Sequence, residues 1–186
     1  MEADWEVEIG PGAPVIEAQW AGFVDLRQNP ELAHGLPEVA LLPQLARALV
    51  LLNGPNSPVW TAKCDLWPLL DSSAWDADEM DAPADFALHA WAGYIDLLPG
   101  SDRIWDSPER AVSLCREVCT RLRIVKEPCC RIDLVVRRAQ TASDELEVGI
   151  SAYLTACGLS PDEGNRALGR AAGRLADALG CHPAIE

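Results

Sequence analysis

The sequence predicts an α+β fold in which helices cover one face of an antiparallel sheet. Three observations support this prediction: a strand-like motif occurs twice, a helix and a second strand follow each copy, and a partial third copy closes the chain. Self-similarity of this kind indicates a fold assembled by internal duplication.

The duplicated motif is the clearest signal. Residues 20–26 read WAGFVDL and residues 91–97 read WAGYIDL, so the two segments share Trp, Ala, Gly, Asp and Leu and pair Phe with Tyr and Val with Ile. If both segments are extended, Trp, Gly, Val or Ile, and Leu lie on one face and Asp lies on the other. We therefore expect two equivalent strands.

A helix and a second strand follow each copy of the motif. Residues 43–52 repeat leucine at helical spacing, and residues 108–122 carry an apolar stripe with the same period. Each predicted helix leads into a strand-like run, at residues 59–67 and 129–136. These runs share a base–apolar–Asp–Leu pattern, KCDL in the first and RIDL in the second. Each copy therefore reads strand–helix–strand.

The predicted repeats span residues 15–67, 86–137 and, in partial form, 147–180. In the third repeat we expect a strand at residues 150–155, followed by a helix. That helix begins at a Ser-Pro-Asp-Glu capping sequence led by Ser160 and ends near Gly180. The helix of the second repeat is expected to begin in the same way, at Ser107-Pro108-Glu109. Residues 5–9 alternate in character like an additional N-terminal strand.

The order β-α-β-β-α-β predicts a ferredoxin-like (split βαβ) sandwich, extended by the N-terminal strand and the C-terminal strand and helix. We expect a single domain over residues 1–186, with the two Trp-Ala-Gly strands side by side at the centre of the sheet. An acidic loop, residues 68–85, joins the first two repeats. Loops of this length often bind or cover a site.

Composition narrows the function classes. The chain has 29 acidic and 15 basic side chains and a net charge of −14, which would repel a nucleic-acid backbone. It has no apolar run of about 20 residues, so we expect no membrane association. Seven cysteines indicate reduced thiols and a cytoplasmic protein. The sequence has no glycine-rich phosphate loop or Cys-x-x-Cys pair, so we expect neither a cofactor nor a metal.

Alternation of side chains divides the predicted sheet into an apolar face, covered by helices, and a polar face that is the candidate site. The polar face is predicted to gather Phe23, Asp25, Lys63, Asp65, Tyr94, Asp96, Arg131, Asp133, Tyr153 and Thr155. Two interpretations stay open. The side chains form exposed cross-strand ion pairs of little energetic value, or they bind a ligand or partner.

The geometry of the predicted sheet places Asp25 and Asp96 on antiparallel neighbouring strands near its pseudo-twofold axis. Lys63 is expected on the strand beside Asp96, and Arg131 on the strand beside Asp25. Two carboxylates in close contact raise one pKa unless a cation intervenes. This pair is therefore the candidate acid and base.

The leading hypothesis is an acidic binding or interaction protein that uses the polar face to bind a small polar ligand, a cationic partner or a second copy of itself. The alternative is a cofactor-independent isomerase or hydrolase for a small polar substrate. In that case Asp25 and Asp96 serve as acid and base, and Lys63 and Arg131 hold a substrate anion. A third hypothesis assigns partner binding to the acidic loop.

Overall fold

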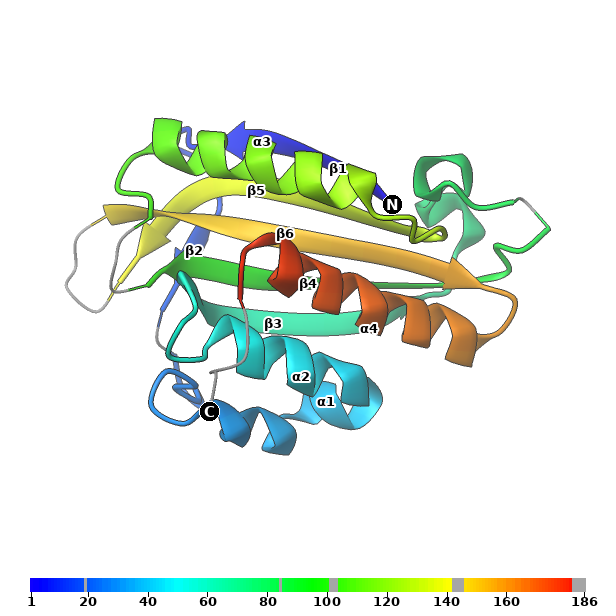
Figure 1. Ribbon diagram of the computed structural model, residues 1–186, viewed down its shortest axis with the longest axis horizontal. Helices are drawn as coiled ribbons and strands as arrows, with labels where there is room; N and C mark the ends of the chain where they lie inside the picture. Colours follow the sequence, from blue (N-terminus) through cyan, green and yellow to red (C-terminus); the bar gives the residue numbers. More distant parts are fainter. Residues whose placement is uncertain (19, 84, 101–103, 142–145, 182–186) are drawn as a thin grey trace.

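A mixed six-stranded sheet forms the centre of the computed structural model, and the helices lie on one of its faces (Figure 1). The structure describes residues 1–18, 20–83, 85–100, 104–141 and 146–181. No helix in these ranges combines the length and the apolar composition needed to cross a membrane.

The strands are β1 (Glu2–Glu8), β2 (Val15–Glu17), β3 (Val59–Leu69), β4 (His89–Pro99), β5 (Cys130–Gln140) and β6 (Leu146–Gly158). The α-helices are α1 (Pro37–Leu41), α2 (Pro43–Leu52), α3 (Pro108–Ile124) and α4 (Pro161–Ala178). Short 3-10 helices η1 (Pro30–Gly35), η2 (Ser72–Ala74) and η3 (Asp78–Met80) lie in the connections.

The strand order is β1-β5-β6-β4-β3, and β2 pairs with β5 beyond the end of β1. β1 and β2 run parallel to β5, and the other pairs are antiparallel. The α+β class with helices on one face is thus confirmed, but the sheet is mixed and not antiparallel throughout as predicted, because β1 and β2 join β5 in parallel. The ferredoxin-like order is wrong, because the position beside β4 is taken by β6 rather than by the first Trp-Ala-Gly segment. The internal duplication itself stays a prediction.

Residues 20–26 form no strand, in contrast to residues 91–97, which lie within β4. Gly22 has a φ of +90°, and the Phe23 N–H donates to the Trp20 carbonyl at 3.0 Å, so the chain turns here. The thirteen-residue strand β6 pairs with both β4 and β5, which satisfies its backbone groups on both edges. It therefore occupies the central position that the first motif was expected to fill.

The predicted helix starts are confirmed by their capping contacts. Ser107 accepts a hydrogen bond from Arg110 N–H at 3.4 Å, and Ser160 accepts one from Glu163 N–H at 3.2 Å. The Glu163 carboxylate in turn accepts from Leu159 N–H at 2.9 Å. These bonds satisfy amides that lack partners within the helix.

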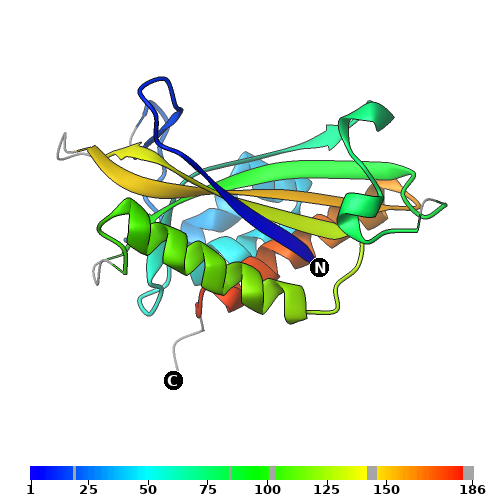
Figure 2. The same ribbon diagram turned by 90° about the horizontal axis from the view of Figure 1, so that it is seen from above.

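The face of the sheet without α-helices, here called the open face, is covered at both ends by connecting loops (Figure 2). At one end Phe23 packs on a cluster that contains Ile16, Trp60 and Leu98. At the other end the connection from β3 to β4 buries Met80, together with Ala82 and Ala87, against the ends of β5 and β6. The open face is therefore exposed only between these two loops.

Candidate functional site

Between the two loops, the open face consists of three rows of side chains that cross five strands. From β3 to β1, the first row is Trp67, Ala92, Thr155, Arg131 and Glu2. The second row is Asp65, Tyr94, Tyr153, Asp133 and Asp4. The third row is Lys63, Asp96, Ser151, Val135 and Glu6. The strand register thus brings together residues from both ends of the chain.

The rows contain most of the predicted site residues, namely Lys63, Asp65, Tyr94, Asp96, Arg131, Asp133, Tyr153 and Thr155. Lys63 is paired with Asp96 across the strands, as predicted. Arg131 was expected beside Asp25 and instead pairs with Thr155 and Glu2. Phe23 lies in the loop that covers one end of the face.

Asp25 corrects the prediction of paired aspartates. It lies outside the strands and is not a ladder neighbour of Asp96. Its carboxylate is held by Arg27, with an Nη2–Oδ2 distance of 2.7 Å. The hydrogen bond from Arg27 lowers the pKa of Asp25. The reason for the error is that residues 20–26 turn, so the alternation of a strand does not apply to them.

Aromatic rings occupy the centre of the open face. The ring centroids of Trp67 and Tyr94 are 6.3 Å apart, and those of Tyr94 and Tyr153 are 6.2 Å apart. The Arg137 guanidinium lies 5.2 Å from the Tyr153 ring centroid and donates to its hydroxyl at 2.7 Å. Burial raises the pKa of Tyr94, and the Asp96 carboxylate adds to this effect. The Tyr94 phenol therefore stays neutral, and the rings of Tyr94 and Tyr153 form a continuous aromatic surface.

The two arginines of the open face are already bound to carboxylates. Arg131 Nε lies 2.8 Å from Asp133 Oδ2, and Arg131 Nη1 lies 3.3 Å from Glu79 Oε2 in the β3–β4 connection. Arg137 Nη2 lies 2.8 Å from Glu8 Oε2. Each guanidinium is balanced by at least one carboxylate, so the two arginines add no net positive charge to the face, which weakens the idea that Arg131 holds a substrate anion.

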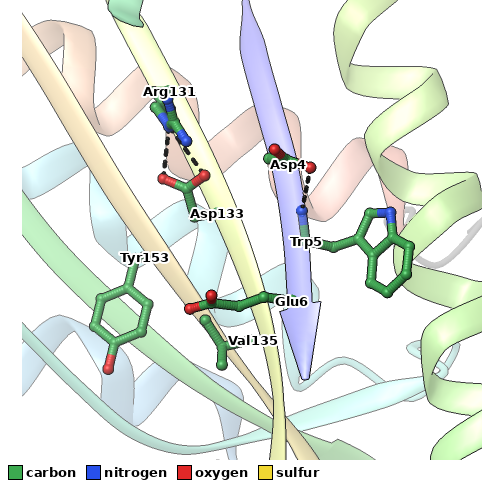
Figure 3. A pocket seen from close by; sticks show the side chains of 7 residues that line it. All are labelled: Asp4, Trp5, Glu6, Arg131, Asp133, Val135 and Tyr153. Carbon is green, nitrogen blue, oxygen red and sulfur yellow. Dashed lines mark hydrogen bonds and ion pairs between the residues drawn. The ribbon is translucent and has the colours of Figure 1, made fainter. Parts of the chain in front are cut away.

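A hollow of about 360 Å³ lies on the β1 side of the open face (Figure 3). It is lined by Asp4, Trp5, Glu6, Arg131, Asp133, Val135 and Tyr153. The Trp5 ring points away from the hollow and lies under the Arg116 guanidinium, 4.8 Å from it. The polar lining therefore comes from three carboxylates and one guanidinium, so the hollow carries net negative charge.

The carboxylates of the hollow differ in how far they are neutralised. Asp133 is bound by Arg131, and Asp4 Oδ1 lies 3.6 Å from Arg123 Nη2. For Glu6, no cation of the described chain lies within ion-pair distance. Glu6 is thus the carboxylate with the largest remaining capacity to bind a cation.

Asp96 lies in the floor of the open face and is only 7% exposed. Burial raises the pKa of its carboxyl, and a hydrogen bond from Ser151 Oγ at 2.5 Å, together with the charges of Lys63 and Arg137, offsets part of this effect. A raised pKa suits a proton donor, but Ser151 beside it is only 1% exposed, so this part of the floor is covered.

Asp96→Asn is expected to make the protein more stable at pH 7–8. Because the folded state holds the Asp96 proton more tightly than the unfolded state, the wild type loses stability as the pH rises through the folded-state pKa. The variant does not titrate, so its advantage should shrink as the pH falls toward about 4. An advantage of about 1 kcal/mol would appear as a rise of about 2–4 °C in melting temperature.

Asp25→Asn is the matched control, with the opposite sign. The pKa of Asp25 is lowered, so its charge favours the folded state, and that contribution is lost as the pH falls through the folded-state pKa. Melting temperatures of both variants between about pH 4 and 8 check the pair, because in this range Asp25→Asn should be less stable than the wild type by a nearly constant amount. An Asp96→Asn variant less stable than the wild type at every pH would contradict the assignment of Asp96.

The acidic side of β1 is the part of the site that the sequence analysis missed. Glu2, Asp4, Glu6 and Glu8 alternate with Ala3, Trp5 and Val7, and β1 pairs in register with β5. The alternation was visible in the sequence as a signal for a strand with an acidic face. The position of this strand next to β5 could not be predicted, because the parallel pairing joins segments about 130 residues apart.

The cysteines offer no activated nucleophile. All seven are free thiols. Burial raises the pKa of Cys64, Cys115, Cys130 and Cys157 to about 12 in each case. Within the described ranges, no group of three or more His, Cys, Asp or Glu side chains is arranged to hold a metal ion.

The geometry described above is thus an acidic and aromatic sheet face with one hollow. Comparisons of the chain with protein-family models, with curated proteins and with solved structures found no match.

Proposed function

We propose that this protein is a binding protein that recognises a cationic protein segment through the open face of its sheet. The observation that carries the proposal is the combination of the unneutralised Glu6 carboxylate with the Tyr153 ring in one hollow. Carboxylates and aromatic faces are the groups that attract arginine and lysine side chains.

The charge of the surroundings supports a cationic partner. Arg131, which lines the hollow, is bound to Asp133, and Arg137 is bound to Glu8, so neither guanidinium opposes an incoming cation as an unpaired charge. The net charge of −14 would also steer a basic partner toward the protein and raise the association rate.

A second copy of the chain fits the open face less well. In a symmetric dimer the same patch is present on both subunits. The acidic rows of the two copies would then lie against each other, and like charges across an interface are unfavourable. A homodimer through this face is therefore not part of the proposal.

The positions of Asp25 and Arg131 do not support the enzyme alternative. It required Asp25 beside Asp96, and Asp25 is bound to Arg27 in a loop. It also required Arg131 to be available for an anion, and Arg131 is bound to Asp133 and Glu79. A binding role, by contrast, requires no change in the ion pairs of the open face.

Titration calorimetry with an oligo-arginine peptide tests the proposal. The double variant Asp4→Asn, Glu6→Gln is expected to bind the peptide at least about 10-fold more weakly than the wild type, and the affinity of the wild type should fall with added salt. The matched control is Glu109→Gln, Asp162→Asn, which removes the same charge from the first turns of α3 and α4.

The control is expected to retain wild-type affinity within about 2-fold, since the two variants have the same net charge. Equal losses in both variants would mean that the peptide responds to net charge alone, and this result would overturn the assignment to the open face. Absence of binding by the wild type would do the same.

A further inference from the structure

Helix α4 contains a glycine that the packing of the protein does not require. A Cβ atom added to Gly173 would have no heavy atom within 4 Å. By contrast, a Cβ atom on Gly169, one turn earlier, would lie 2.6 Å from Gln44 Cβ in α2, so close helix packing explains that glycine. Glycine inside a helix is less stable than alanine. Gly173 therefore keeps space free at a cost in stability.

This space belongs to a cavity of about 320 Å³ between α2 and α4. Three arginines line it: Arg47 from α2, and Arg170 and Arg174 from α4. These are three of the 15 bases in a chain of net charge −14. Helices α2 and α4, which line the cavity, lie on the side of the sheet opposite the open face (Figure 2).

The arginines from α4 are held in place by carboxylates. Glu127 Oε1 lies 2.7 Å from Arg170 Nε, and Glu127 Oε2 lies 3.6 Å from Arg174 Nη2. Asp177 Oδ2 lies 3.6 Å from Arg174 Nη1. Each guanidinium has five N–H donors, so these contacts orient the two side chains and leave further donors unused.

Arg47 has no ion-pair partner within the described part of the chain. The three arginines carry one more charge than the two carboxylates of Glu127 and Asp177 neutralise, so the cavity retains positive charge. The planar fork of a guanidinium matches the oxygens of a phosphate group, which can accept two parallel hydrogen bonds. The cavity has the size of a site for a small ligand.

We propose that the cavity between α2 and α4 binds a small phosphate-bearing anion, either free phosphate or a phosphomonoester. Arg47 and Arg174 contact the phosphate oxygens from the two helices, and Glu127 positions Arg174 and Arg170. Gly173 leaves room for the anion against α4. This site shares no residue with the open face, so it is independent of the proposed binding of a cationic segment.

Titration calorimetry with inorganic phosphate and with glycerol phosphate, at constant ionic strength, tests the site. The wild type is expected to bind at least one of the two saturably, and the stronger of the two identifies the form of phosphate. Arg47→Gln and Arg174→Gln should each weaken binding at least about 10-fold. Arg110→Gln, an exposed arginine of α3 outside the cavity, should change binding less than about 2-fold.

The Gly173→Ala variant distinguishes a glycine that leaves room for a ligand from one that has only a structural role. It is expected to raise the melting temperature, because alanine favours the helix and meets no neighbour, and to weaken phosphate binding at least about 3-fold. Two results would overturn the proposal: no saturable binding of either probe by the wild type, or equal affinity in the wild type, Arg47→Gln and Arg174→Gln.

Discussion

Trp105→Ala is expected to lower the free energy of unfolding by about 3–5 kcal/mol, the largest effect of a single substitution that we expect. Trp105 lies between β4 and α3 and is only 1% exposed. Its indole Nε1–H donates to the Val148 carbonyl at 2.8 Å, which ties this connection to β6. Alanine would leave a large cavity in the main core and a partly buried carbonyl without its donor.

Urea denaturation followed by circular dichroism measures this effect. Trp67→Ala is the matched control, since Trp67 is 38% exposed on the open face, and we expect it to cost about 1 kcal/mol or less. Trp105→Phe keeps most of the ring volume and removes the donor, so it should cost less than alanine. If Trp105→Ala proved no more harmful than Trp67→Ala, the buried position of Trp105 would be refuted.

Gly93→Ala is expected to lower the free energy of unfolding by about 1–3 kcal/mol, the usual cost of an overpacked site. A Cβ atom on Gly93 would lie 2.8 Å from the Asp65 carbonyl oxygen and 3.2 Å from Leu66 Cβ. Both neighbours belong to β3, which is paired with β4 at this point. The new methyl group can be accommodated only if the two strands move apart.

The corresponding glycine of the first motif provides the control. Gly22 has a φ of +90° and no heavy atom within 4 Å of an added Cβ, so its constraint is conformational and not steric. Asparagine tolerates left-handed backbone better than alanine does. We therefore expect Gly22→Asn to be more stable than Gly22→Ala, and Gly93→Asn to be at least as unstable as Gly93→Ala.

Thermal and urea unfolding of these four variants give the comparison. The same ranking of Asn and Ala at both positions would show that the two glycines have the same role. That result would contradict the different structures of the two motifs described here.

The elements that could be predicted from the sequence are those governed by contacts between near neighbours in the chain. The leucine spacing of residues 43–52 predicted a helix, and α2 spans Pro43–Leu52. The caps at Ser107 and Ser160 predicted the starts of α3 and α4. Alternation in residues 91–97 predicted which side chains face the helices, and Ile95 and Leu97 are buried in the main core as expected.

Local sequence could not distinguish the two copies of the motif. Both have the composition of a strand, yet the two positions beside β4 are filled by β3 and β6, which leaves none for the first copy. The choice depends on the pairing energy and core burial of the whole sheet, to which β6 contributes Ile150, Ala152 and Leu154. The seven residues of the motif therefore do not indicate which segment of the chain will pair with β4.

The candidate site divides in the same way. Alternation along each strand determined that Lys63, Asp96 and Tyr153 share the open face. Only the strand order decided that the acids of β1 lie beside β5, that Arg131 is bound to Asp133, and that Asp25 is not paired with Asp96. The sequence by itself thus determined the class of fold and the side of each strand that is polar, because these follow from local periodicity. The tertiary structure decided which strands are neighbours, because that depends on competition among distant segments for the same edge.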